Sequence, residues 1–212
     1  MTRKTQISLK ILTWLACLWP LGKLVYGAAT NNLGADPTAT ITFTTGLATL
    51  RLLIISLAIT PLRRVSSRLN WLIRFRRLLG LFAFFYGTLH LLTYVALYAG
   101  FDLNTMAADI AKRRYIMAGL SAWLLLLPLA ATSTNWALRK LGGKRWNRLH
   151  KLVYVAAVCG IVHYWWQVKP GVLTPLTTTV VLAALLLARP LQLPLQAWMQ
   201  QARTEFFKTP PA

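Results

Sequence analysis

The sequence predicts an all-α membrane protein, a polytopic helix bundle with about six transmembrane helices in a single domain that covers residues 1–212. The first observation is composition: 56% of the residues are hydrophobic and only 13% are charged, against roughly a quarter charged in soluble domains. The second is that the apolar residues gather in six long runs. The third is that the basic residues cluster between these runs, mostly at every second connection.

Each predicted span is an apolar run close to the 17–25 residues that cross a bilayer core. The first, residues 9–28, follows basic residues as a signal peptide does, but Pro20, Lys23 and its length favour a retained helix. The other predicted spans are residues 43–61, 78–99, 116–135, 150–167 and 174–190, and residues 191–212 are a predicted cytoplasmic tail.

The distribution of basic residues predicts the orientation. Eighteen of the 24 Lys and Arg lie in the N-terminal segment, in residues 62–77 and 136–151, and in the tail, whereas four lie in the connections on the other side. Basic loops stay in the cytoplasm, so both termini are predicted to be cytoplasmic, in a bacterial inner membrane. The net charge of +20 is thereby explained without nucleic acid.

Several function classes are excluded by what the apolar runs lack. None of the four acidic residues falls inside a run, which argues against a carboxylate proton relay, a paired-carboxylate hydrolase and a carboxylate-bridged metal site. Cys17 and Cys159 belong to no CxxC or CxxCH motif, so neither a redox dithiol nor covalently attached haem is indicated. Nucleophile and zinc-protease motifs are also missing.

The three histidines are the strongest functional signal. His90 lies 13 residues beyond Arg77, and His163 lies 13 residues beyond His150. At 1.5 Å per residue, His90 and His163 both lie roughly 20 Å from the cytoplasmic edge. Two histidines at one depth on different helices are placed to be axial ligands of one haem iron. A three-histidine zinc site is excluded, because His150 and His163 lie roughly 20 Å apart along one helix.

Four further residues are candidates for cofactor binding. His150 is either a ligand at a second haem or redox site, or an interfacial histidine. Arg51, inside the second span, is predicted to be buried and to bind a haem carboxylate or another anionic ligand; the alternatives are backbone carbonyls or an outward-reaching side chain. Arg76 and Arg77 either bind a cofactor on the cytoplasmic side or only keep that end of the helix in the cytoplasm.

Short motifs in a fixed order carry a family resemblance. They are Gly34-Ala35-Asp36-Pro37, Thr60-Pro61-Leu62-Arg63, Arg76-Arg77-Leu78-Leu79-Gly80-Leu81, Leu89-His90, Ala131-Thr132-Ser133-Thr134, Trp146-Asn147-Arg148-Leu149-His150-Lys151-Leu152-Val153-Tyr154 and His163-Tyr164. Over nearly the whole chain, this set resembles the MsrQ (formerly YedZ) family of haem-binding membrane subunits.

The resemblance implies a ferric-reductase-like transmembrane domain, related to NADPH oxidases, that carries haem b, with FMN as a further candidate cofactor. It implies electrons drawn from the quinone pool or a cytosolic flavin reductase. They would go to a periplasmic molybdenum subunit, MsrP, which reduces methionine sulfoxide in oxidised proteins. Catalysis is expected on that partner, docked against residues 29–42 and 100–115, and no catalytic residue is expected on this chain.

The chain departs from the related oxidases in one respect. Those domains carry two histidines on each of two helices, whereas the third span here has only His90, with Arg76 and Arg77 about 13 residues earlier. Arginine stays protonated and is a poor iron ligand. One bis-histidine haem is therefore expected, and a second is left open. The rival functions are a small transporter and a non-redox anchor subunit.

Overall fold

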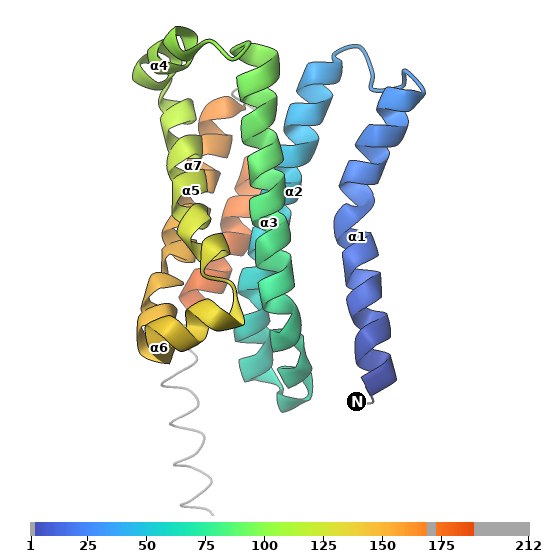
Figure 1. Cartoon of the computed structure of the whole chain (residues 1–212), viewed down its shortest axis with the longest axis vertical. Helices are drawn as coiled ribbons and strands as arrows, with labels where there is room; N and C mark the ends of the chain where they lie inside the picture. Colours follow the sequence, from blue (N-terminus) through green and yellow to red (C-terminus); the bar gives the residue numbers. More distant parts are fainter. Residues whose placement is uncertain (1–2, 169–172, 189–212) are drawn as a thin grey trace, which may run out of the picture.

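The computed structural model describes residues 3–168 and 173–188, and this part of the chain is helical without strands. The long helices stand side by side in one bundle (Figure 1). The predicted all-α membrane fold is confirmed. The predicted tail and the last two residues of the sixth predicted span lie outside the described residues.

Helices occupy all six predicted places. Four are long and apolar enough to cross a membrane: α1 (Arg3–Ala29), α2 (Pro37–Val65), α3 (Ile73–Thr93) with its flanking turns, and α5 (Arg114–Ala131). Two others are apolar but shorter, α7 (Leu152–Gln167) and the helix Thr174–Ala188. The number of helices that cross the membrane therefore stays a prediction.

Several short elements were not predicted, because three of them are too short or too polar to form an apolar run and hydropathy does not distinguish a π-helical turn inside the predicted span 78–99. They are the 3-10 turn η1 (Ser67–Leu72), the π-helical turn η2 (Tyr94–Tyr98), α4 (Leu103–Lys112) and α6 (Asn135–Leu149). Side-chain caps start two of these helices: Asp102 accepts hydrogen bonds from two backbone amides of α4, and the Thr134 hydroxyl accepts one from α6. In the same way Asp36 caps α2.

The bundle is built from two closely packed helix pairs. α2 packs mainly against α3, and α5 mainly against α7. The apolar core where the pairs meet contains Leu57, Ala83 and Ala157, whose side chains are fully buried. Small residues at such contacts let helix backbones approach closely in a membrane bundle.

α1 is attached to α3 by one buried hydroxyl. The Tyr86 hydroxyl donates a hydrogen bond to the Cys17 carbonyl at 2.7 Å and accepts one from the Leu21 amide at 3.1 Å. In a regular helix the Leu21 amide would donate to the Cys17 carbonyl, four residues earlier. These two groups lie next to Pro20, which has no N–H to donate. Tyr86 is therefore inserted into the backbone ladder of α1 at its proline and connects the outermost helix to the bundle.

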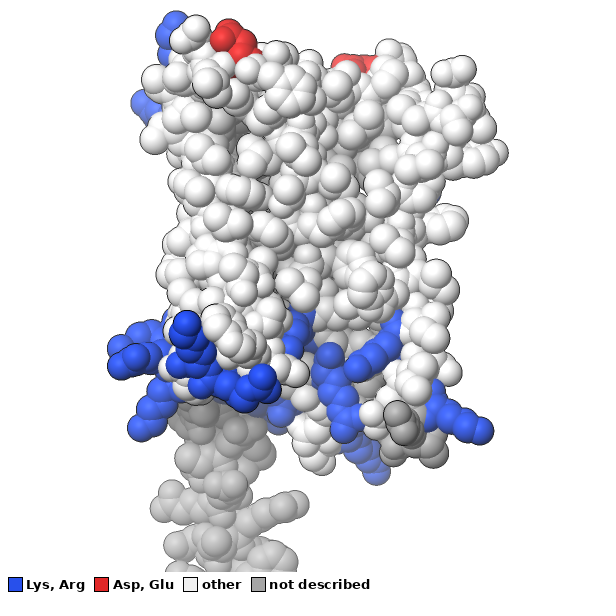
Figure 2. Space-filling model, in the orientation of Figure 1, with Lys and Arg blue, Asp and Glu red and all other residues white. Residues whose placement is uncertain are grey.

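Charged residues are separated along the bundle axis (Figure 2). Most Lys and Arg gather at the end that holds the N-terminus, η1 and α6, whereas the described acidic residues, with a few basic ones, lie at the end that holds α4. A wide band without charge separates the two ends on the face shown. This arrangement supports the predicted orientation, with the basic end in the cytoplasm.

Candidate functional site

The structure brings His90 of α3 and His163 of α7 together, as the depth count predicted. Their ring centroids lie 5.8 Å apart and their planes cross at 85°. A metal–imidazole bond is about 2 Å long, so two imidazoles that bind one metal ion in line have centroids about 6 Å apart. The spacing therefore suits a single ion between the two rings.

Both imidazoles are held through the same nitrogen. His90 Nδ1 lies 3.0 Å from the Thr42 carbonyl oxygen of α2, and His163 Nδ1 lies 2.7 Å from the Tyr115 carbonyl oxygen of α5. A carbonyl only accepts, so each Nδ1 must carry the proton and donate it. Each Nε2 is then left with its lone pair, which is the state a metal-binding histidine needs.

A glycine stands behind each imidazole. A Cβ atom on Gly46 would lie 3.0 Å from His90 Cε1, and one on Gly119 would lie 2.7 Å from His163 Nδ1. Each glycine comes four residues after the residue whose carbonyl holds the ring. α2 and α5 therefore present the same arrangement to the two imidazoles, a carbonyl and a glycine one helical turn apart. Neither glycine was predicted to belong to the site, although both lie in predicted spans.

The protein ligands are too few for a bare metal ion. In the described ranges 3–168 and 173–188, no three His, Cys, Asp or Glu side chains gather around one point. A haem supplies four nitrogens of its own and needs only two axial ligands. His90 and His163, each with a free Nε2 lone pair, supply two such ligands, so the residues present fit a haem better than an isolated zinc ion.

His150 lies apart from this pair, at the C-terminus of α6. Its ring stacks on Trp146, with centroids 3.7 Å apart, and its Nε2 lies 3.2 Å from the Thr132 hydroxyl. That hydroxyl donates to the Pro128 carbonyl, so His150 Nε2 is assigned as the donor. Here the distal nitrogen is engaged by the protein, unlike those of His90 and His163.

Arg76 and Arg77 lie near His150. The charges of both arginines act on the His150 ring, so the three side chains lie close together. Arg77 Nη1 also donates to Asn135 Oδ1 at 2.8 Å, which connects α3 to the first residue of α6. The structure thus gathers the three cytoplasmic-side candidates into one basic cluster, defined here as His150, Arg76 and Arg77.

The expected burial of Arg51 is wrong. Its side chain is exposed, on a stripe of α2 that also exposes Phe43, Ile55 and Leu62. Counting residues gave the depth of Arg51 along the helix but not the direction in which it points. Exposure favours the outward-reaching alternative.

Comparisons with known proteins agree with this geometry. Residues 45–161 match the family model described as ferric reductase like transmembrane component. A relative from Ralstonia nicotianae is 52% identical over 164 residues, 77% of this chain and 75% of its own length. One from Herminiimonas arsenicoxydans is 50% identical over 85% of this chain and 84% of its own, and one from Xanthomonas axonopodis pv. citri is 44% identical over 87% of each. All three are described as protein-methionine-sulfoxide reductase heme-binding subunit MsrQ.

Proposed function

Because the chain belongs to the MsrQ family of haem-binding subunits, within the ferric-reductase-like transmembrane family, we propose that it conducts electrons across the membrane on a haem held by His90 and His163. The observation that carries the proposal is the pair of imidazoles with ring centroids 5.8 Å apart, each donating Nδ1–H to a backbone carbonyl. The third histidine, His150, stacks on Trp146 instead and its Nε2 is engaged by Thr132.

The protein's contribution at this site is to hold the ligands and keep them neutral. The Thr42 and Tyr115 carbonyls fix the tautomer and the angle of each ring, and Gly46 and Gly119 leave room for the rings. When bound, haem supplies one-electron chemistry, with a potential that its axial ligands and surroundings adjust.

The basic cluster is proposed as the cytoplasmic-side redox site. Its guanidinium groups suit the carboxylates of a second haem or the phosphate of FMN, and His150 is the candidate ligand or contact there. Because Thr132 engages His150 Nε2, ligation through that nitrogen would require the hydrogen bond to break. Haem counting decides between a second haem and another role.

The remaining proposals follow the resemblance. The haem is of the b type, held without a covalent bond, since the chain has no CxxCH motif. The electrons come from the quinone pool or a cytosolic flavin reductase and leave to the molybdenum subunit MsrP, which repairs oxidised periplasmic proteins. The relatives' description as subunits of a methionine sulfoxide reductase supports this placement in a bacterial inner membrane.

The test is a dithionite-reduced minus oxidised visible spectrum of the purified protein, with pyridine-haemochrome quantification. We expect b-type bands with at least one haem per chain. His90→Ala and His163→Ala should each remove the haem between α3 and α7, because one remaining imidazole cannot supply both axial bonds. His150→Ala is the matched control and should keep this haem.

Stoichiometric haem in both the His90 and His163 variants would refute the assignment of the ligands. A protein that stays colourless after haem-supplemented expression would refute electron transfer altogether and favour a transporter or an anchor subunit. If the wild-type protein contains more than one haem per chain, the haem content of the His150→Ala variant decides whether the second haem is bound at the basic cluster.

A further inference from the structure

Side chains at the end of the bundle that holds α4 form a continuous chain of hydrogen bonds between α3, α4 and α5 (Figure 1). Asp109 of α4 stands at its centre and uses both carboxylate oxygens. The Tyr94 hydroxyl donates to Oδ2 at 3.1 Å, and Arg113 Nε donates to Oδ1 at 3.0 Å. The Arg113 guanidinium also donates from Nη1 to the Tyr115 hydroxyl at 3.1 Å. Tyr94, Asp109, Arg113 and Tyr115 are termed the outer network.

Both ends of the outer network reach the segments that carry the proposed haem ligands. Tyr94 comes one helical turn after His90, and its amide donates to the His90 carbonyl. At the other end, the backbone carbonyl of Tyr115 accepts the 2.7 Å hydrogen bond from His163 Nδ1. The Tyr115 ring also lies 6.2 Å from the His163 ring, centroid to centroid. Asp109 is therefore connected to both imidazoles through other residues.

The two carbonyls that hold the imidazoles differ in their positions along their helices. Thr42 is the sixth residue of α2, more than a turn from its start, and the Asp36 side chain caps that start. Tyr115 is only the second residue of α5. The N-cap residue of α5 is Arg113, whose side chain has donors only and so cannot accept from the helix amides. Helix ends fray where a cap is missing, so the carbonyl that holds His163 needs support from outside α5.

The junction between α4 and α5 is where that support is given. Arg113 alone separates the two helices, with backbone angles of φ −109° and ψ 97°. Its amide donates to the Asp109 carbonyl at 2.8 Å, and its side chain pairs with the Asp109 carboxylate. An exposed ion pair contributes little to stability, but the Asp109 side chain is only 17% exposed and accepts from two side chains. The outer network therefore fixes geometry more than it adds stability.

We propose that Asp109 is a positioning residue of the haem site and acts on His163. Through Arg113 it fixes the start of α5 and thereby the Tyr115 carbonyl. Through Tyr94 the same carboxylate ties this start to α3. The inference rests on the proposed function, which names haem as the group between the two rings. The other imidazole should depend on Asp109 less, because the carbonyl that holds it lies within a capped helix.

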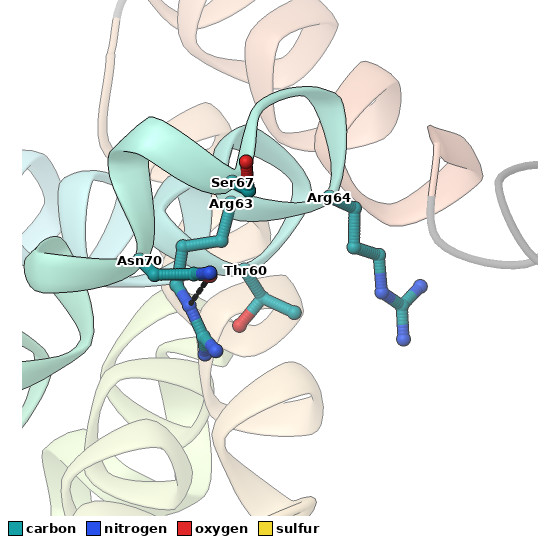
Figure 3. A pocket seen from close by; sticks show the side chains of 5 residues that line it. All are labelled: Thr60, Arg63, Arg64, Ser67 and Asn70. Atoms are coloured by element: carbon teal, nitrogen blue, oxygen red, sulfur yellow. Dashed lines mark hydrogen bonds between the residues drawn. The ribbon is translucent and has the colours of Figure 1, made fainter.

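Two variants break the outer network at different points, and each has a matched control. Asp109→Asn removes the central carboxylate. Asp102→Asn makes the same change at the cap of the same helix, where asparagine serves as well as aspartate. Arg113→Gln removes the guanidinium that joins α4 to α5. Arg63→Gln removes one that donates to Asn70 at the basic end of the bundle, beside the polar pocket shown in Figure 3.

The first readout needs no haem. The chain has three histidines, so selective nitrogen-15 labelling gives few signals in nuclear magnetic resonance, and substituting each histidine in turn assigns them. Wild-type His163 should show a protonated Nδ1 and an unprotonated Nε2. In Asp109→Asn and Arg113→Gln the His163 signals should shift toward a mixture of the two tautomers, because the carbonyl acceptor is no longer fixed. The His90 signals should change less, and both controls should match the wild type.

The second readout uses the haem-loaded protein. Both network variants should bind haem about three- to tenfold more weakly, less than the roughly 10–100-fold cost of losing a direct partner of a metal ligand. The midpoint potential and the electron paramagnetic resonance g values should change as well, because the angle between the two rings, 85° in this structure, is no longer fixed. A purely structural role of Asp109 would lower the unfolding temperature and move neither of them.

Unchanged His163 signals in both network variants would overturn the inference. So would an equal change in Asp102→Asn, because any loss of charge from α4 would then have the same effect. A colourless wild-type protein would refute the proposed function instead, and the nitrogen-15 spectra of the variants would still decide the role of Asp109.

Discussion

A single methyl group at Gly119 should disturb His163, the proposed haem ligand. In the Gly119→Ala variant the new Cβ would lie 2.7 Å from His163 Nδ1 and 3.0 Å from its Cε1. Ordinary contacts between heavy atoms are about 3.5–4.0 Å, so the ring must retreat by about 1 Å. The ring is held on the same side by its 2.7 Å hydrogen bond to the Tyr115 carbonyl, so retreat also breaks or stretches that bond.

The magnitude follows from two opposed terms. Overpacking costs about 1–3 kcal/mol, whereas Ala in place of Gly favours a helix by about 1 kcal/mol. The helix itself gains the propensity term with or without haem, whereas the clash is felt when His163 occupies the ligating position. We therefore expect little change in the stability of the haem-free protein and a haem affinity lower by about 5–30-fold, which corresponds to 1–2 kcal/mol.

The assay is haem retention during titration with a competing haem-binding protein, together with the visible and electron paramagnetic resonance spectra of the oxidised form. Gly22→Ala is the matched control, because Gly22 also lies inside an apolar helix and a Cβ there meets nothing within 4 Å. Gly46→Ala should fall between the two, since its Cβ would lie 3.0 Å from His90 Cε1.

An unaltered spectrum and wild-type retention in Gly119→Ala would refute this reasoning. So would an equal loss in Gly22→Ala, because that result would mean that any added methyl group in a span has the same effect.

Two further predictions concern the scaffold. Tyr86→Phe removes both hydrogen bonds between α3 and α1, which should destabilise the protein by about 1–3 kcal/mol in thermal unfolding and increase cleavage within α1 by protease; Tyr98→Phe, at an exposed tyrosine, should do neither. The pKa of Asp102 is lowered, first by the hydrogen bond from the Thr105 hydroxyl, so the cap on α4 should be fully present above the usual aspartate pKa of 3.8 and lost as pH falls through the lowered value. Hydrogen exchange of α4 amides should then accelerate only in that acidic range, and unchanged protection there would contradict the capping role.

The pairing of His90 with His163 could be predicted because depth in a bilayer is close to a linear coordinate. Each helical residue advances 1.5 Å, so counting from the basic edges gave the correct height for both histidines. The same count could not give the direction in which Arg51 points, because direction around a helix depends on how neighbouring helices pack. The exposed stripe of α2 that contains Arg51 became visible only in the folded bundle.

The glycine device behind the imidazoles could not be read from composition or hydropathy. Gly46 and Gly119 are common residue types in membrane helices, and their importance arises only where α3 and α7 cross them. A search for carbonyl-bearing residues cannot help either, because every residue has one.

The two helix pairs contribute equivalent halves of the proposed haem site. In the first, α2 supplies a carbonyl and a glycine to a histidine of α3; in the second, α5 supplies the same two elements to a histidine of α7. Each half sets its own imidazole by contacts within the pair, which is where packing is most extensive. The site itself exists only where the pairs meet, since neither half has two nitrogen ligands. A haem bound there joins α3 to α7 directly, so its binding free energy also holds the two pairs together.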